Sequence, residues 1–215
     1  MYDSYKFMGL RKHLVDSLRN KGIRDEKVLN AIQKVPRHFF FESSFQKFAY
    51  EDKPFAIGAG QTISQPYTVA FQSELLQVKK GDRILEVGTG SGYQACILAE
   101  MDTKVFSIER QRSLYDHAVK FLPKMGYTIK LFFGDGYKGL PSYSPFDKIL
   151  VTAGAPFIPE PLIGQLKVGG ILVIPVGSSD VQIMTTITKL SEDTCEKKEH
   201  GTFRFVPLLK NRAED

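Results

Sequence analysis

The residues best suited to chemistry in this sequence form a glycine-rich run that starts with an acid, Glu86-Val-Gly88-Thr-Gly90-Ser-Gly92-Tyr93. The run follows a short apolar segment and opens a helical pattern. Glycines in such a turn let the backbone bend sharply and let a ligand approach without a Cβ in the way. A dinucleotide fingerprint, G-x-G-x-x-G, would place its last glycine at Tyr93, whereas Gly92 comes one residue early. The spacing therefore argues against a nicotinamide-dependent oxidoreductase. A glycine turn with a purely structural role is the other alternative.

Two further acids follow the next strand-like segments. Glu109 comes about 20 residues after the glycine run, where an acid accepts hydrogen bonds from ribose hydroxyls. Asp135, in Gly134-Asp-Gly136, ends a third segment, although an aspartate there also suits a simple turn. Three acids at three strand ends predict a site that faces one bound nucleoside.

These acids need a parallel sheet to bring them together, and the pattern from residue 81 onward predicts one. Short apolar segments alternate with helical patterns, which favours right-handed crossovers and a doubly wound, mostly parallel α/β fold. Two later strand candidates have no helix between them, so we expect an antiparallel edge pair. The expected strands are 83–87, 105–108, 129–133, 148–152, 170–176, 184–190 and 202–208, and the expected helices are 93–101, 111–124 and 159–166.

The first 50 residues are expected to form helices. Leu10, Leu14 and Leu18 recur every four residues, and Asp25 is placed to cap the next helix, which Pro36 ends. Residues 51–64 are expected to be a loop. Pro66 suits the first turn of a helix that runs to about residue 77.

Composition excludes several classes of protein. The chain has 215 residues, 42% hydrophobic and 25% charged, which is typical of a soluble globular protein. Its two cysteines, Cys96 and Cys195, cannot form a disulfide scaffold and favour a reducing compartment. Its four histidines lack metal-ligand spacing, so no metal site is expected. The longest apolar run, 168–177, is too short to span a bilayer, and no secretory signal is evident. We expect a cytoplasmic protein without membrane contact.

The glycine run resembles the first motif of S-adenosylmethionine-dependent methyltransferases with the Rossmann-like fold, E/D-x-G-x-G-x-G. The resemblance implies S-adenosylmethionine as cofactor and S-adenosylhomocysteine as product. It places Glu86 near the methionyl amino group and Gly88, Gly90 and Gly92 along the cofactor. Glu109 would hold the ribose, and Asp135 would bond the adenine amino group, with the Gly136 backbone beside it.

Other segments resemble the protein-L-isoaspartate O-methyltransferase family, from about residue 9 to residue 209. They are Val35-Pro-Arg37-His-Phe39, Gly58-Ala-Gly60-Gln-Thr-Ile-Ser64-Gln-Pro66-Tyr67, Gly134-Asp-Gly136, Val151-Thr-Ala153 and Phe205-Val-Pro-Leu208. The resemblance implies methylation of the free α-carboxyl of isoaspartyl residues in damaged proteins and peptides. The ester then collapses to a succinimide, which reopens partly as normal aspartate.

The same resemblance assigns Ser64 as the catalytic residue and places Gln61, Thr62, Ser64 and Tyr67 beside the cofactor. Taken alone, Ser64 also suits a helix N-cap before Pro66. The substrate needs no general base, because an α-carboxylate with a pKa near ~3.5 is ionised at neutral pH. The chain length fits one domain, which we expect over 1–215: helices and the active-site loop in 1–78, the cofactor-binding core in 79–177 and strands in 178–215.

The net charge of +5 leaves open a methyltransferase that acts on nucleic acid or a small molecule. Amino-group nucleic-acid enzymes usually carry [DNS]-P-P-[YFW] after the fourth strand, where this chain has Thr152-Ala-Gly-Ala-Pro156. Neither cysteine follows a proline, as cytosine-C5 enzymes require. A non-catalytic binding protein on the same fold is a further alternative. We expect a monomer that acts on isoaspartyl proteins and does not bind nucleic acid.

Overall fold

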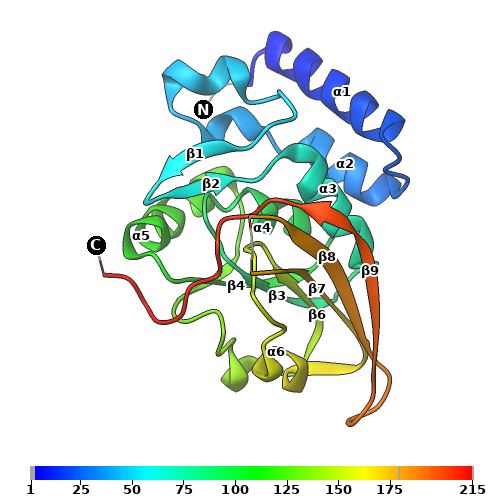
Figure 1. Ribbon diagram of the computed structural model, residues 1–215. Coiled ribbons are helices and arrows are strands. Elements are labelled where there is room, and N and C mark those ends of the chain that lie inside the picture. The colour runs from blue at the N-terminus through cyan, green and yellow to red at the C-terminus, as the bar shows by residue number, and fades with distance from the viewer. Residues whose placement is uncertain (1–2, 179, 215) are drawn as a thin grey trace.

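The computed structural model describes residues 3–178 and 180–214. At its centre is a seven-stranded sheet in the order β5-β4-β3-β6-β7-β8-β9 (Figure 1). Strands β3 to β7 are parallel, and β8 and β9 are antiparallel additions at one edge. The expected mostly parallel sheet with an antiparallel edge is confirmed. The strands are β3 (Arg83–Val87), β4 (Lys104–Glu109), β5 (Lys130–Phe133), β6 (Phe146–Val151), β7 (Leu166–Val176), β8 (Gln182–Lys189) and β9 (Cys195–Phe203).

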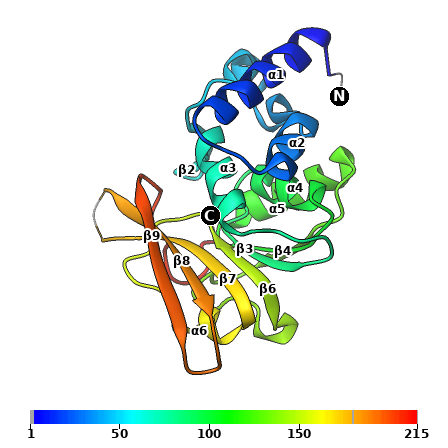
Figure 2. The ribbon, with the colours of Figure 1, turned by 90° about the vertical axis from the view of Figure 1, so that its right-hand side faces the viewer.

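Most helices cover one face of this sheet (Figures 1 and 2). The Asp25 carboxylate caps α2 as expected, accepting a hydrogen bond of 2.8 Å from the Lys27 N–H. The helices are α1 (Tyr5–Asn20), α2 (Glu26–Lys34), α3 (Pro66–Leu75), α4 (Tyr93–Glu100), α5 (Arg112–Phe121) and α6 (Glu160–Gly164). Short 3-10 turns are η1 (Arg37–Phe40), η2 (Ser43–Phe48), η3 (Leu122–Met125) and η4 (Pro141–Tyr143).

Alternation along the strands divides the core into two layers. In β3, Ile84 packs with residues of α1 to α5, whereas Leu85 and Val87 pack on the opposite face. That opposite face is covered by α6, through Leu162, and by loops. The sheet is therefore buried on both sides, as parallel sheets require, but its two covers differ in size.

The path of the chain fixes where a ligand can bind. From β3 it moves outward to β4 and β5, then returns to the other side of β3 to form β6 and β7. The strand order thus reverses between β3 and β6. In open α/β sheets ligands bind at such a reversal, beyond the carboxyl ends of the strands.

Residues 51–64, expected to be a loop, contain a β-hairpin instead. Its strands are β1 (Phe55–Gly58) and β2 (Gln61–Ile63), joined through Gly58, Ala59 and Gly60, whose φ angles are 92°, 50° and 68°. The strands are too short to show an alternating pattern, so the turn glycines dominate the local sequence. The expectation was wrong because the hairpin forms through packing against distant segments, and a local sequence pattern does not reveal that packing.

The prediction of a last strand over 202–208 is also wrong for most of that range. The edge strand β9 ends at Phe203, and the segment that follows forms isolated parallel bridges, between Gly154 and Pro207 and between Gln111 and Ala213. Strand β9 is almost entirely exposed, so it carries no apolar alternation that a sequence pattern could reveal.

Within the described ranges, no helix combines the length and apolar character needed to cross a bilayer.

Candidate active site

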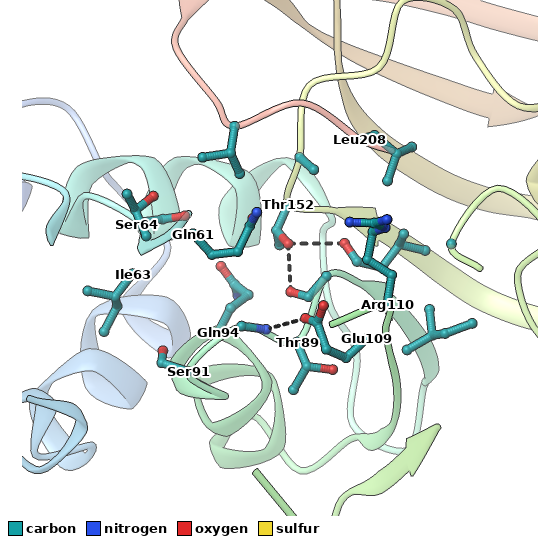
Figure 3. Close-up of a pocket in the computed structure, with 18 of the residues that line it drawn as sticks. Gln61, Ile63, Ser64, Thr89, Ser91, Gln94, Glu109, Arg110, Thr152 and Leu208 are labelled. Atoms are coloured by element: carbon teal, nitrogen blue, oxygen red, sulfur yellow. Dashed lines mark hydrogen bonds between the residues drawn. The ribbon is translucent and has the colours of Figure 1, made fainter. Parts of the chain in front are cut away.

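A cavity lies at the carboxyl ends of β3, β4 and β6, where the strand order reverses. The glycine loop, residues 88–91, lines its base. Strand β2 and Ser64 line one side, and residues 206–209 of the C-terminal segment line the other. Figure 3 shows Ser64 and Leu208 on opposite sides of the cavity, with Thr152 between them.

The glycine loop has a backbone that other residues would strain. Gly88, Gly90 and Gly92 have φ angles of 101°, 52° and 84°. A Cβ on Gly88 would collide with the Thr152 hydroxyl, and one on Gly92 would lie 2.7 Å from Leu122 Cδ2. Gly88 and Gly90 line the cavity, whereas Gly92 serves as the N-cap of α4. The loop therefore supports a ligand through backbone rather than side chains.

Glu109 projects from the end of β4 into this cavity. Its side chain is only 5% exposed. Oε2 accepts a hydrogen bond of 2.9 Å from the Gly90 N–H (Figure 3). Oε1 accepts one of 2.8 Å from the Gln111 N–H. Each carboxylate oxygen has a further lone pair available, so Glu109 can accept from a ligand hydroxyl without losing these contacts.

Glu86 lies behind the glycine loop and does not line the cavity. It is fully buried and hydrogen-bonds Ser107, whose hydroxyl shares a second hydrogen bond of 2.6 Å with Thr89. Burial raises the pKa of Glu86 to about 8, a shift that the Ser107 hydrogen bond opposes and the nearby Glu109 carboxylate reinforces. At neutral pH the Glu86 carboxyl is therefore mostly protonated in the empty site. Its assignment to the methionyl amino group stays a prediction.

Ser64 lies between β2 and α3 and lines the cavity. The N-cap of α3 is Gln65, so the alternative that Ser64 caps this helix is not what the structure has. The Ser64 hydroxyl makes no hydrogen bond with any residue of 3–178 or 180–214. It can therefore donate to a bound substrate.

Arg37 holds the backbone of Ser64 in place, a role that sequence reasoning missed. Its guanidinium donates from Nη2 to the Ser64 carbonyl at 2.8 Å and from Nε to the Ala49 carbonyl at 3.0 Å. The guanidinium carbon also lies 4.6 Å from the centre of the Tyr93 ring. Burial lowers the pKa of Arg37 to about 10, which leaves it charged at neutral pH. The Val35-Pro-Arg37 segment was a signal, but its target is 27 residues away.

Asp135 and Gly136 are neighbours in sequence but line different hollows. Gly136 lines the cavity, whereas Asp135 lines two neighbouring hollows. The Asp135 carboxylate accepts hydrogen bonds of 2.9 Å from the Tyr137 N–H and 3.0 Å from the Asn211 N–H. Asp135 thus anchors the C-terminal segment, and its contact with adenine stays a prediction.

The remaining predicted residues divide between two hollows. Gln61 and Thr62 line the cavity, and Thr62 also lines a second groove. Tyr67 lines only that groove, and its N–H donates to Asp52 at 2.7 Å. The structure therefore brings Gln61 and Thr62 beside the cavity and places Tyr67 outside it.

Sequence reasoning also missed several cavity residues. The Thr152 hydroxyl lies 2.7 Å from the Gly88 carbonyl oxygen, and Gln94 follows from the first turn of α4. Arg110 lines the cavity and donates from Nε to the Asn211 carbonyl at 3.1 Å. Thr152 was detectable in principle, because it directly follows β6 as Ser64 directly follows β2. The position of the Arg110 side chain depends on its contact with the C-terminal segment, and no local sequence pattern predicts that contact.

The C-terminal segment crosses the cavity and is fastened at both ends. At one end the Gly154 N–H donates to Val206 and the Leu208 N–H donates to Gly154, at 2.8 and 2.7 Å. At the other end the Ala213 N–H donates to the Arg110 carbonyl at 2.8 Å. In Figure 1 this segment runs from β9 across the strand ends toward α5. Backbone hydrogen bonds at both ends thus hold the C-terminal segment across the cavity.

Known proteins with similar sequences share one activity. The model of the Protein-L-isoaspartate(D-aspartate) O-methyltransferase family matches residues 9–213. A protein-L-isoaspartate O-methyltransferase of Christiangramia forsetii is 60% identical over 213 residues, 99% of this chain and 100% of that protein. One of Flavobacterium johnsoniae is 59% identical with the same coverage.

Solved structures agree with these relatives. A protein-L-isoaspartate O-methyltransferase superposes with a TM-score of 0.85 at 30% identity, covering 94% of this chain and 66% of that one. A Plasmodium falciparum structure assigned to the same activity, in complex with S-adenosyl-L-homocysteine, has a TM-score of 0.82 at 28% identity. It covers 94% of this chain and 99% of its own.

Proposed function

The chain belongs to the protein-L-isoaspartate(D-aspartate) O-methyltransferase family, and on that premise we propose which residues perform each part of its reaction. The enzyme transfers a methyl group from S-adenosylmethionine to the free α-carboxyl of L-isoaspartyl residues in damaged proteins and peptides. A carboxylate oxygen forms the new O–CH3 bond as the S–CH3 bond breaks, and the bonding electrons stay on sulfur. The products are a methyl ester and S-adenosylhomocysteine.

The residues around the cavity fit this cofactor. When bound, it supplies an electrophilic methyl group on a positively charged sulfur. Oε1 of Glu86 and Oε1 of Gln94 are buried acceptors without a hydrogen-bond partner among the described residues. Gln94 lines the cavity, and Glu86 lies close behind it. The unpaired Gln94 oxygen suits a ligand with a methionyl ammonium group, and Glu86 suits it once its carboxyl has lost the proton. Glu109 suits the ribose hydroxyls. We assign the other cofactor contacts to Gln61, Thr62, Ser64, Gly88, Gly90 and Gly136, with Gly92 supporting the loop.

Ser64 orients the reacting carboxylate. Its hydroxyl is a neutral donor, which can hold one carboxylate oxygen without cancelling the negative charge that makes the other oxygen nucleophilic. A cation in direct contact would stabilise the reactant more than the less charged transition state. No proton needs to be removed, so the reaction requires no general base.

Arg37 keeps Ser64 in position from behind. The guanidinium contacts the Ser64 carbonyl rather than its hydroxyl, so it fixes the loop and does not reach the substrate. Its contact with the Tyr93 ring, which also lines the cavity, ties the loop to the start of α4. Holding donor and cofactor site in one rigid arrangement favours the in-line approach that methyl transfer needs.

The single observation that carries this assignment is that Ser64, with an unpaired hydroxyl, and Glu109 line one cavity at the carboxyl ends of the strands. The test is methylation of paired peptides, one isoaspartyl and one aspartyl, with methyl-labelled S-adenosylmethionine. Label is expected only in the isoaspartyl peptide, as a base-labile ester. Equal labelling of both peptides, or of neither, would contradict the function.

We further propose that the protein acts as a cytoplasmic monomer on isoaspartyl proteins, without nucleic acid or membrane. The relatives named above favour a protein substrate over the alternative of nucleic acid or a small molecule. One hydrophobic cluster contains residues from Leu14 to Met184, which supports a single domain. The described residues hold no group of three or more His, Cys, Asp or Glu placed to bind a metal ion.

A further inference from the structure

A second groove opens beside the cavity on the side of Ser64. It lies between α3 and the end of β9, together with the segment that follows β9. Thr62, Ser64, Thr152 and Val206 line both the groove and the cavity. The groove therefore leads to the hydroxyl that we assign to the reacting carboxylate, and a peptide whose isoaspartyl group reaches Ser64 can lay its neighbouring residues there.

One wall of this groove is aromatic. Tyr67 and Phe71 stack with ring centres 5.8 Å apart, and the ring centre of Phe71 lies 5.2 Å from that of Phe203. Phe203 in turn lies 6.5 Å from Phe205. All four rings are partly exposed. A half-buried aromatic wall of this kind binds bulky apolar side chains by removing their surface from water.

Among the described residues that line the groove, Arg204 is the basic side chain that is charged at neutral pH. Arg204 is exposed, lines the groove, and makes no hydrogen bond or ion pair with residues 3–178 or 180–214. The lysines nearby on β9 are different, because Lys197 pairs with Glu199 and Lys198 with Glu196. Arg204 is thus available to a ligand.

The histidine of the groove adds no charge at neutral pH. His200 shares a hydrogen bond of 2.8 Å with the Thr186 hydroxyl. Burial, with Lys198 as a smaller cause, lowers the pKa of His200 below its usual value. No acidic side chain is among the described residues that line the groove. Its charge at neutral pH is that of Arg204.

We propose that this groove binds the residues beside the isoaspartyl residue and selects peptides with an acidic and a bulky apolar side chain there. This rests on the proposed function. Arg204 lines the groove but not the cavity, so it attracts a flanking carboxylate without contacting the reacting one. The groove thereby adds affinity while the methyl acceptor keeps its nucleophilicity.

The test varies one flanking residue of an isoaspartyl host peptide among Glu, Gln and Lys, at each position on both sides in turn. At the positions that reach Arg204, the wild-type kcat/KM should be about three- to tenfold higher for Glu than for Lys, as expected for one partly solvated charge pair. The Arg204→Glu variant should invert this ratio, and Arg204→Gln should bring it near one. The ratio should shrink in 0.5 M KCl, because salt screens exposed charges.

The matched control is Lys124→Glu, which makes the same change in net charge. Lys124 is an exposed residue of η3, which packs on α5 beside the opposite edge of the sheet from β9. Its Glu/Lys ratio should equal that of the wild type. An Arg204→Glu enzyme with the wild-type ratio at every flanking position would overturn the proposal, and so would an equal change in Lys124→Glu.

Two further measurements complete the test. Phe203→Leu should reduce the preference for a flanking Phe over Ala by a few-fold, since leucine keeps the wall apolar but offers less surface. An unchanged preference would remove the aromatic wall from the proposal. A second copy of the chain covering the groove would appear as a dimer in sedimentation and would overturn it. If the wild type methylates no isoaspartyl peptide, the proposed function itself fails, and that outcome is separate from the others.

Discussion

Among single residues, Ser64 and Glu109 differ in what they offer a ligand. Ser64 carries a hydroxyl without a partner among the described residues, whereas both carboxylate oxygens of Glu109 already accept backbone hydrogen bonds. Those bonds fix the carboxylate before any ligand arrives. Glu109 is therefore suited to binding, and Ser64 to orienting a substrate that changes during the reaction.

Replacing Ser64 by alanine should lower kcat about tenfold and should weaken the affinity for S-adenosylhomocysteine by a smaller factor. A hydrogen bond to a charged group contributes about 1.5–3 kcal/mol net, and its lower limit sets the scale of the loss because the carboxylate loses charge in the transition state. Steady-state kinetics and calorimetric titration measure the two quantities. Ser142→Ala, an exposed residue of η4, is the control. A loss of affinity with kcat preserved would make Ser64 a structural residue.

Replacing Glu109 by glutamine should mainly weaken cofactor binding. Glutamine keeps the shape but loses the charge that accepts from ribose hydroxyls, and its NH2 group faces one of the two backbone N–H donors, of Gly90 or Gln111. Hydrogen bonds to charged groups contribute about 1.5–3 kcal/mol. We expect the dissociation constant of S-adenosylhomocysteine to rise about 10- to 100-fold in calorimetric titration. An unchanged constant would show that the ribose is held elsewhere.

Among the secondary-structure elements, the contact between η1 and the β2–α3 connection determines the position of Ser64. Arg37 comes from η1 and contacts the carbonyls of Ala49 and Ser64, as well as the Tyr93 ring at the start of α4. One buried side chain thus links the N-terminal part, the catalytic loop and the cofactor-binding core.

Arg37→Met should lower kcat in the enzyme that has Ser64 but not in a Ser64→Ala background, because Arg37 acts through that residue. It should also lower the free energy of unfolding by about 2 kcal/mol or more, since the buried Ala49 carbonyl and the partly buried Ser64 carbonyl lose their donor. Arg37→Lys should recover part of both. Equal loss of kcat in the two backgrounds would mean that Arg37 supports the fold without positioning Ser64.

For the molecule as a whole, Glu86 makes the stability of the ligand-free protein depend on pH. Its pKa is about 8 in the folded state and near the usual 4.5 when unfolded. Between these values the folded state holds a proton that the unfolded state has lost, so the free energy of unfolding falls as pH rises. The stability that Glu86 contributes is complete below about pH 4.5 and is lost as pH rises through 8.

Glu86→Gln should remove this dependence, because glutamine has a similar shape and does not titrate. The melting temperature of Glu86→Gln relative to the wild type should rise between pH 5.5 and pH 8 in thermal unfolding without ligand. Glu42→Gln, at an exposed glutamate, should show the same difference at both pH values. A parallel response of wild type and Glu86→Gln would contradict a buried, protonated Glu86.

Much of the core was predictable because its signals are local. Strand β3, the glycine loop and α4 follow one another within 18 residues, Arg83 to Glu100, and each depends on apolar alternation or on glycine at positive φ. The hairpin of β1 and β2 and the edge strand β9 were missed because short or exposed strands carry no such alternation. Their pairing depends on distant segments.

The sequence by itself determined the order of the core elements, the site at the strand ends and the chemical types of Ser64 and Glu109, because these depend on neighbours along the chain. Only the tertiary structure decided that Glu86 lies behind the glycine loop, that Asp135 holds the C-terminal segment and that Tyr67 faces the groove. It also decided that Arg37 supports Ser64. These are contacts between segments up to 76 residues apart, and burial and pairing at such separations arise only when the chain packs.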